Sequence, residues 1–462
     1  MIGREKELNY LKELYGSNNF EYLVMYGRRR VGKTTILQEF SKDTNAIFFP
    51  AREKNDKLNL EDFSKIIQIH YDKMYISSFK SWEDAFDYIA NKTTSRTAVI
   101  IDEFPYIVEE NPSVKSLLQH AIDHKFKQKN IFLILCGSSV SMMQNEIMGI
   151  KSPLHNRQTA TLELKPFDYL DSSSFFPNYS NIEKLLCYGI LGGVPRYLEA
   201  FNTNKSIKEN ISTRIIKNGS YLYEEPENLL KAELRDTNTY NSILSAIASG
   251  KNRIIEIADS IHEDKTKVAK YLLTLQTLRL IEKKVPCGDS ENSKKSIYKI
   301  KDNFFKFWFR YEFTNNAYYA LLGPDEASSE IITDLSNLMG DVFEDIAKEY
   351  FIRLAKQRKL PFIPYYLDKW WGNNPAIKAQ DDVDLLALDK SKTKAIFVEC
   401  KFTNSPMPLE EYNDLVTATK AFPNVKEKYL YFISKSGYTT PVINQAKIDN
   451  AILLSIDDLF DF

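Results

Sequence analysis

The segment Gly27–Thr34 constrains the fold of this chain more than any other feature of the sequence. It reads Gly-Arg-Arg-Arg-Val-Gly-Lys-Thr and fits the phosphate-binding pattern G-x-x-x-x-G-K-[ST] in full. It follows an apolar, strand-like run, Tyr22–Tyr26, and leads into a helix-like run, Thr35–Phe40. The motif requires this strand–loop–helix context. The sequence therefore predicts a phosphate-binding loop in an α/β core.

Each residue type in this loop has a chemical reason. Glycines let the backbone fold around a phosphate without a Cβ clash, so that N–H groups and the helix N-terminus face the anion. Lys33 can reach the β- and γ-phosphates, and Thr34 can hold Mg²⁺. The predicted cofactors are ATP and Mg²⁺. The candidate nucleotide-binding residues here are Gly27, Arg28, Arg29, Arg30, Val31, Gly32, Lys33, Thr34 and Thr35.

Composition sets the class of the protein. A length of 462 residues predicts about three domains. The formal net charge is -1, so bulk charge does not make the chain a binder of polyanions. The four cysteines are far apart and form no C-x-x-C pair, which argues against a zinc site or a disulfide framework. No apolar run approaches the roughly 18 residues of a membrane span, and the charged N-terminus lacks a signal core. We expect a cytoplasmic protein.

Four regions follow one another along the chain. Short apolar runs alternate with helical patterns over residues 1–165, which predicts a parallel sheet covered on both faces. Residues 166–235 have a helical pattern, broken at Leu191–Pro195. Residues 236–312 have three helical patterns followed by two strand-like runs, the order of a winged helix-turn-helix. Residues 313–462 hold a connector, a helix from Leu338 to Leu354 and further strands.

The run Thr97–Ile101 is an apolar strand that ends in Asp102 and Glu103. In phosphate-loop ATPases the strand beside the loop ends in this way. Asp102 would orient Mg²⁺ or its water, and Glu103 would polarise the attacking water as general base. Read alone, the segment is equally a core strand that enters an acidic turn. Downstream of a complete phosphate loop, the functional interpretation is favoured.

Three further residues could act on the phosphates. Ser138 and Ser139 follow the apolar run Ile131–Cys136. Their hydroxyls could sense the γ-phosphate, or they could cap the next helix. Arg157 could act as an arginine finger at a subunit interface, neutralising charge on the transferred phosphoryl group. The competing interpretation is an arginine that forms a surface ion pair. A finger would imply a homo-oligomer.

Together these segments resemble the archaeal-type ATPases of the AAA+/STAND group. The resemblance covers roughly the first 310 residues and implies an ATPase core, a helical lid and a winged helix. It also implies that the segment Ile2–Glu5 lies near the adenine and that Pro195 contacts the nucleotide from the lid. The segments that carry it are Met1–Leu8, Gly27–Thr34, Ile101–Pro105, Leu135–Ser139 and Leu191–Pro195.

A second group of charged residues lies in the C-terminal third. Glu399 and Lys401 are two residues apart on a strand-like run, so both project from one face, while Cys400 points the other way. Asp384 can join them if its strand pairs with theirs, and Glu344 can add a fourth group from a preceding helix. Carboxylates of this kind suit Mg²⁺ or Mn²⁺, which can activate water at a phosphodiester.

This pattern resembles the PD-(D/E)xK nuclease fold, a restriction-endonuclease-like α/β domain. The catalytic candidates are Glu399 and Lys401, and the metal-ligand candidates are Glu344, Asp384 and Glu399, beside Thr34 and Asp102 in the ATPase core. Because the E-x-K motif is short, a strand with alternating polar residues also produces it by chance. Such domains can also lose catalysis and still bind DNA.

The sequence therefore predicts an ATPase that acts on DNA, with nucleotide state regulating a metal-dependent nuclease-like domain. Lys265, Lys267 and Lys270 would begin a recognition helix that meets DNA phosphates, unless they form an ordinary solvated face. Lys283 and Lys284 tilt the charge of the wing toward phosphate. The alternative function is a nucleotide-switched regulatory ATPase whose C-terminal domain binds without cleaving.

Overall fold

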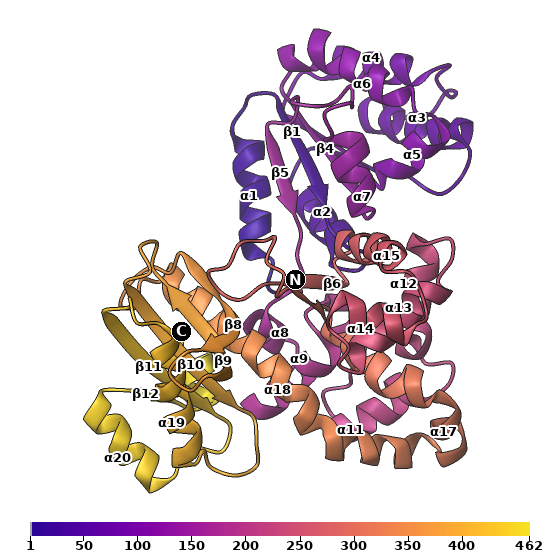
Figure 1. Cartoon of the computed structure of the whole chain (residues 1–462). Coiled ribbons are helices and arrows are strands. Elements are labelled where there is room, and N and C mark those ends of the chain that lie inside the picture. Colours follow the sequence, from indigo (N-terminus) through magenta and orange to yellow (C-terminus); the bar gives the residue numbers. More distant parts are fainter. Residues whose placement is uncertain (1) are drawn as a thin grey trace. The chain divides into compact units, whose positions relative to one another are not determined.

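The computed structural model describes residues 2–462 and divides into two compact units, residues 1–166 and 167–462 (Figure 1). The first unit contains a five-stranded parallel sheet in the order β2-β3-β4-β1-β5. This confirms the predicted parallel α/β core. The strands are β1 Glu21–Tyr26, β2 Ala46–Pro50, β3 Thr97–Asp102, β4 Ile131–Gly137 and β5 Ala160–Glu163.

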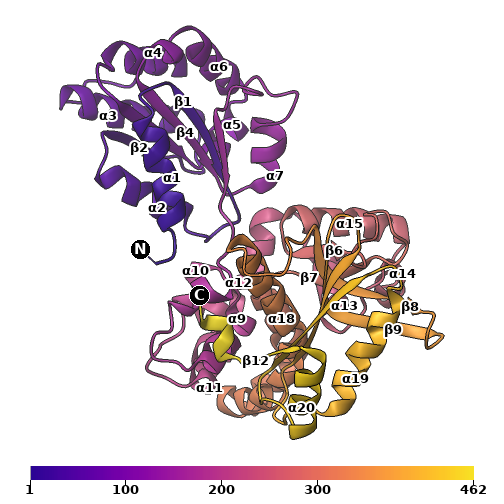
Figure 2. The same cartoon turned by 90° about the vertical axis from the view of Figure 1, so that its left-hand side faces the viewer.

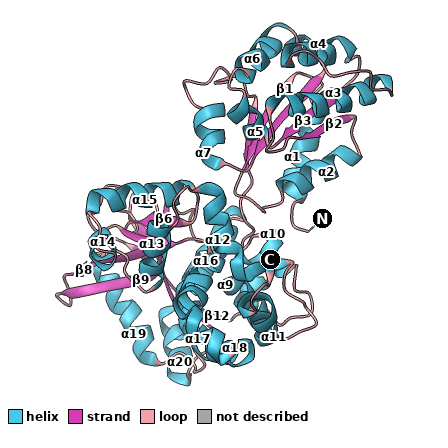
Figure 3. Cartoon of the chain, turned by 90° about the vertical axis from the view of Figure 1, so that its right-hand side faces the viewer, coloured by secondary structure: helices cyan, strands magenta, loops and turns pink. Residues whose placement is uncertain are grey.

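Helices cover both faces of this sheet (Figure 3). Side chains alternate between the faces of a strand, and the central strands are apolar on both. Leu23 and Met25 pack with α1 and α2, whereas Tyr22 and Val24 belong to the core on the other face, with the helices that follow β2 and β3. The helices are α1 Glu5–Gly16, α2 Lys33–Lys42, α3 Asp56–Asp72, α4 Trp82–Lys92, α5 Phe104–Glu110, α6 Val114–His124 and α7 Val140–Met142.

The strand order corrects one expectation. The sequence predicts that β3, which ends in Asp102, lies directly beside the loop strand β1. In the structure β4 lies between them, and β1 pairs with β4 and β5. The order of strands in a sheet depends on contacts between residues far apart in sequence, so the apolar runs alone do not reveal it. The sequence also does not predict β5, which pairs with the second edge of β1. The consequence is that the tip of β4, which carries Ser138, lies between the loop and the acidic end of β3.

The second unit begins with helices around a break at residues 191–195. Glycine at position 193 lets the backbone of this break approach Phe167 closely, because a Cβ there would lie 1.8 Å from the carbonyl oxygen of Phe167. Three helices and an antiparallel hairpin follow, in the order predicted for a winged helix. These elements are α8 Tyr169–Ser173, α9 Asn181–Leu191, α10 Pro195–Leu198, α11 Ile207–Asn210, α12 Tyr221–Glu233, α13 Asn238–Ala248, α14 Ile254–Ser260, α15 Lys265–Thr277, β6 Ile281–Lys284 and β7 Ile297–Ile300.

The predicted connector of mixed character is wrong, because residues 314–356 are almost entirely helical. After α16 Asn303–Trp308, helix α17 spans Thr314–Leu322, and α18 spans Pro324–Lys356. Helix α18 begins fourteen residues before the predicted start at Leu338. Pro324 occupies its first turn, where the missing N–H costs nothing, and Gly323 precedes it with a φ of 93°.

A mixed sheet ends the chain, in the order β12-β11-β10-β9-β8. Strands β8, β9 and β10 are antiparallel neighbours, and β10, β11 and β12 are parallel. Helix α18 packs on one face, and α19 and α20 pack on the other (Figure 2). The sequence missed the edge strands β8 and β12. The elements are β8 Tyr366–Asn374, β9 Ala379–Leu388, β10 Lys394–Lys401, α19 Leu409–Ala418, β11 Glu427–Ser434, α20 Thr440–Asp449 and β12 Ile452–Leu454.

Candidate functional site

The phosphate loop has the backbone geometry that its sequence predicts. Gly32 has a left-handed φ of 96°, and helix α2 begins at the next residue, so its N-terminus opens onto the loop. A Cβ at Gly27 would lie 2.3 Å from the carbonyl oxygen of Leu164. The ammonium of Lys33 spans the loop and donates to the carbonyl oxygens of Gly27 at 2.8 Å and Arg28 at 3.0 Å.

Thr34 and Asp102 meet although their strands are not neighbours. The hydroxyl of Thr34 donates to the Asp102 carboxylate at 2.7 Å, and Asp102 is 2% exposed. A hydroxyl and a carboxylate next to a lysine form a donor set of hard oxygens that fits Mg²⁺ on a nucleotide. Bound ATP and Mg²⁺ would supply the phosphoanhydride and its charge-balancing ion. The residues Thr34 and Asp102 would hold the ion in place, and Lys33 would turn to the phosphates.

Glu103 and Ser138 form the second polar pair of this site. Glu103 has a left-handed φ of 51° and begins helix α5. Its carboxylate accepts hydrogen bonds from the backbone N–H of Ser138 at 3.0 Å and from the Ser138 hydroxyl at 2.9 Å. Ser139, by contrast, accepts from the N–H of Met142 and caps α7. Ser139 therefore has the capping role, whereas the role of Ser138 as a sensor of the γ-phosphate stays a prediction. The strained backbone at Glu103 holds its carboxylate beside the tip of β4.

Arg4 braces the loop from the N-terminal segment, a contact that the sequence reasoning did not identify. Its guanidinium donates to the carbonyl oxygens of Val31 at 3.0 Å and Lys165 at 2.8 Å. Arg4 is 5% exposed. The only signal in the sequence is its place in the segment Ile2–Glu5, which the resemblance assigns to the neighbourhood of the adenine. In the structure it links the loop to the residues that follow β5.

Arg157 is engaged within its own chain. Its guanidinium donates to the Asp123 carboxylate from Nε at 2.9 Å and from Nη2 at 2.8 Å, and to the carbonyl oxygen of Pro153 at 2.8 Å. The hydrogen bond from Arg157 lowers the pKa of Asp123 to about 2. An arginine finger would have to give up these bonds, so this role and the homo-oligomer it implies stay predictions. Pro195 lies in the second unit at the start of α10, and its contact with the nucleotide also stays a prediction.

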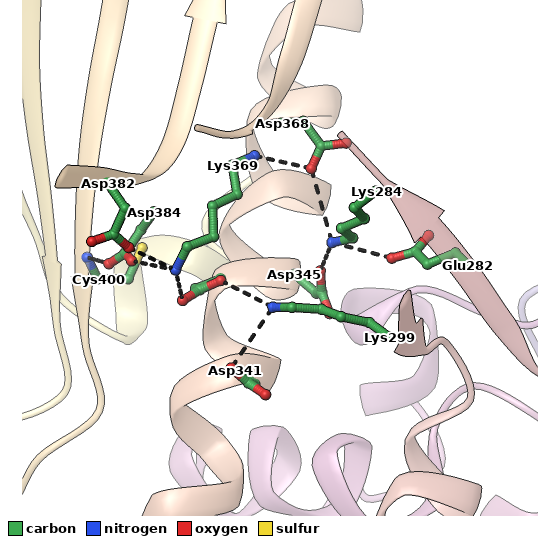
Figure 4. A network of polar contacts seen from close by, with 11 residues as sticks. Glu282, Lys284, Lys299, Asp341, Asp345, Asp368, Lys369, Asp382, Asp384 and Cys400 are labelled. Carbon is green, nitrogen blue, oxygen red and sulfur yellow. Dashed lines mark hydrogen bonds and ion pairs between the residues drawn. The ribbon is translucent and has the colours of Figure 1, made fainter. Parts of the chain in front are cut away.

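The C-terminal charges separate into two groups that share Asp384. On β10, Lys401 contacts Glu399 at 3.0 Å, as the strand period predicts, and also reaches Glu411 on α19 at 2.8 Å. Glu344 on α18 instead pairs with Lys369 on β8 at 2.6 Å. Asp384 contacts Lys369 at 3.3 Å and accepts the backbone N–H of Cys400 at 2.9 Å (Figure 4).

The pKa values of Glu344 and Glu399 support the division of these charges into two groups that share Asp384. Burial, followed by the charge of Asp384, raises the pKa of Glu344 to about 7 and that of Glu399 to about 8. Asp384 is thus the neighbour common to both groups. Lys369 also contacts Asp382 at 3.1 Å, so its ammonium lies among three carboxylates. Lys369 is not among the residues that the sequence predicts for this site, because it lies on β8, an edge strand that the sequence does not predict.

The predicted metal ligands of the C-terminal domain do not gather into one cluster in this structure. Across residues 2–462 there is no group of three or more His, Cys, Asp or Glu side chains placed to hold a metal ion. Lysines already balance the carboxylates, with Lys369 between Glu344 and Asp384 and Lys401 beside Glu399. In this geometry the three carboxylates have lysine partners, and their role as metal ligands stays a prediction.

Some lysine side chains of the winged helix are exposed to solvent, and others form ion pairs. Lys265 and Lys270 on α15 are exposed, and Lys267 pairs with Glu263 at 2.7 Å. Lys284 does not face solvent as predicted: it is 7% exposed and contacts Asp345 on α18 at 2.9 Å and Glu282 at 3.1 Å (Figure 4). Desolvation works against its charge, yet these carboxylates raise its pKa above the usual value. Lys284 therefore ties the wing to α18.

Comparison with known proteins agrees with this fold. Residues 1–201 match the family described as ATPase domains predominantly from Archaea, and residues 308–414 match a family of archaeal and bacterial proteins of unknown function. With its phosphate loop and parallel sheet, the chain is a P-loop ATPase of archaeal type.

Individual relatives make the assignment more specific. An uncharacterised protein of Methanocaldococcus jannaschii is 35% identical over 406 residues, which covers 87% of each chain. The chain therefore belongs to the same family as this relative. A Walker-type ATPase of Pyrococcus abyssi, with 21% identity and a TM-score of 0.52, covers 67% of this chain and 96% of its own. That likeness concerns the fold alone. None of the helices described here combines the length and hydrophobicity needed to cross a membrane.

Proposed function

We propose that this ATPase acts on DNA and that its nucleotide state regulates a nuclease-like C-terminal domain. The observation that carries the proposal is the pairing of β9 and β10. It brings Asp384 near the E-x-K motif, in which Lys401 and Glu399 are in contact at 3.0 Å. The exposed lysines Lys265 and Lys270 at the start of α15 add a candidate contact to DNA phosphates.

A second candidate is favoured by Lys369. Because its ammonium lies between Glu344 and Asp384 at 2.6 and 3.3 Å, the carboxylates have a built-in counter-cation. A domain of this kind would bind DNA without cleaving it, and the ATPase would act as a switch. Both candidates share the ATPase core and differ only in the chemistry of the last domain.

One experiment separates the candidates. The full chain is incubated with single-stranded, duplex and branched DNA, with ATP or ADP, and with Mg²⁺ or Mn²⁺, and both gel shift and cleavage are measured. We expect a shift that depends on nucleotide. Cleavage that is lost in Lys401→Ala and retained in Glu410→Gln, an exposed residue of α19, would support the nuclease. A shift without cleavage would support the binding domain, and neither under any condition would refute both.

Lys369 itself gives a sharper prediction. Lys369→Met is expected to lower the free energy of unfolding by about 3–5 kcal/mol in a chelator, because it leaves half-buried carboxylates without their partner. We expect Mn²⁺ to restore part of this stability, since a divalent cation can replace the ammonium. The measurement is thermal unfolding with and without Mn²⁺.

The control for this prediction is Lys447→Met, an exposed residue of α20 that should change neither quantity. An equal loss of stability with and without Mn²⁺ would mean that the carboxylates do not accept a metal even when Lys369 is removed. That result would leave only the binding candidate.

A further inference from the structure

A cavity of about 510 Å³ lies within the second unit, between helix α10 and the turn that leads into α12. Its walls come from α10, from the end of the π-helical segment Ile211–Ile216, from residues 217–220 and from the first residue of α12. The volume lies in the range of ligand sites, about 300–1,000 Å³. None of the site residues predicted from the sequence lines this cavity.

Positive charge prevails among the side chains that line the cavity. Arg196, Arg214 and Lys217 are present, and Glu199 is the one acidic residue among the described residues of the lining. Arg196 and Glu199 are 3.8 Å apart with side chains 60% and 56% exposed, so this ion pair is weak. Even if that pair counts as neutral, two cations remain. The cavity therefore attracts anions.

The two remaining cations are accessible to a ligand. Arg214 and Lys217 are both exposed, and neither side chain has an ion pair or a hydrogen bond within residues 2–462. Their backbone, by contrast, is held in place. The hydroxyl of Ser220 donates to the carbonyl oxygen of Arg214 at 2.8 Å, and the N–H of Lys217 donates to that of Ser212 at 3.0 Å. The charged groups therefore extend from a well-anchored turn and are open to an anion.

Exposed cations of this kind favour a polyanion over a single small anion. One anion at an exposed site gains little, because water screens the interaction. A nucleic-acid strand carries a row of phosphates with condensed counterions, and the release of these counterions drives binding. Arginine matches phosphate geometry with several donors, and lysine supplies a point charge. A nucleic-acid backbone is therefore the anion that this lining fits best.

Tyr221 favours an unpaired strand over a duplex. It is 39% exposed, and the guanidinium of Arg196 lies over its ring, 5.1 Å from the ring centroid. Aromatic rings and arginine planes stack on unpaired bases, which are accessible in a single strand and stacked on one another in a duplex. A base that stacks here lies within the same lining as Arg214 and Lys217.

We propose that this cavity binds the backbone of single-stranded DNA. Arg214 and Lys217 contact its phosphates, and one base stacks on Tyr221 and Arg196. This inference rests on the proposed action of the protein on DNA, and it adds a contact outside the winged helix. Because Arg196 directly follows Pro195, the predicted contact to the nucleotide, strand binding at this site is expected to respond to nucleotide state.

The test measures the binding of a labelled single-stranded oligodeoxynucleotide without terminal phosphates to the full chain, by fluorescence anisotropy at several salt concentrations. We expect Arg214→Met together with Lys217→Met to weaken binding about 10-fold or more. The slope of log K against log salt should fall by about 1, because fewer counterions are released. Tyr221→Leu should weaken binding about fivefold or more through lost stacking, with little change in slope. The control is Lys208→Met, an exposed lysine of α11 outside the lining, which should change neither quantity.

Different failures of this test have different meanings. If the double substitution leaves the affinity and the salt slope of DNA binding unchanged, this inference is wrong and the proposed action on DNA stands. An equal loss in Lys208→Met would assign the effect to overall charge and would also overturn it. Competition by pyrophosphate at the same concentration of phosphate groups would show a site for a free anion instead of a strand. No binding of any DNA by the wild-type chain would refute both this inference and the proposed function.

Duplex DNA of the same sequence is titrated in parallel, and a loss of binding confined to the duplex would contradict the assignment to an unpaired strand. The melting temperature and the rate of ATP hydrolysis are measured for each variant. We expect both to match those of the wild type, because the replaced side chains are exposed and do not belong to the phosphate-loop site.

Discussion

Replacing Lys33 with alanine is expected to abolish ATP binding, with an affinity at least about 100-fold lower. A charge-assisted hydrogen bond contributes about 1.5–3 kcal/mol, and Lys33 can make more than one to the phosphates. In the structure its ammonium bonds to the carbonyl oxygens of Gly27 and Arg28 across the loop, so it lies within the loop that is expected to hold the triphosphate. Equilibrium binding of a fluorescent ATP analogue measures the loss.

The same lysine also stabilises the phosphate loop itself, so the variant needs a folding check. Removing two hydrogen bonds to backbone carbonyls is expected to lower the free energy of unfolding by about 1–3 kcal/mol. Lys42→Ala is the matched control, because Lys42 lies on the same helix with a side chain 68% exposed and pairs only with Glu39. Unchanged nucleotide affinity in a folded Lys33→Ala protein would refute the assignment of the phosphate loop.

Glu103→Gln is expected to separate binding from hydrolysis. Positioned general bases typically contribute about 10²–10⁴ to the rate, so we expect ATP hydrolysis to fall by about that factor. ATP affinity should change less than about threefold, because the role expected for Glu103 is to polarise the attacking water and not to hold the phosphates. The glutamine keeps a carbonyl oxygen that can accept the Ser138 N–H, so the side chain should stay in place. Phosphate release under saturating ATP measures the rate.

Glu110→Gln is the control for this prediction, because Glu110 is an exposed carboxylate at the end of the same helix, α5. It should leave both affinity and rate unchanged. Retained hydrolysis in Glu103→Gln would show that another group polarises the water. In that case Ser138, whose hydroxyl contacts Glu103 at 2.9 Å, would be the next candidate to replace.

Much of this site could be predicted because its signals are local. The motif Gly27–Thr34 specifies its own turn, lysine and helix N-terminus within eight residues. The contact between Glu399 and Lys401 follows from the period of a strand. The short apolar runs of the ATPase core predict strands that are buried on both faces of the sheet. In each case the interacting groups are close in sequence, so backbone geometry alone brings them together.

Other features could not be predicted because they depend on partners far away in sequence. The predicted contribution of Lys284 to a basic wing surface is one example. Its side chain is instead buried against Asp345, which lies sixty-one residues later in the sequence. Lys369 was missed because β8 is an edge strand with mixed polarity, and only its antiparallel pairing with β9 places it beside Asp384. The short strand β5 was missed for the same reason.

The sequence by itself determined that the chain has a phosphate-binding loop in a parallel α/β core, because that motif contains its own geometry. Only the tertiary structure decided how the distant charges are paired. It placed β4 between β1 and β3 and divided the C-terminal carboxylates around Asp384. Strand order and helix packing fix these contacts, and both are set by burial across the whole unit rather than by any short stretch of residues.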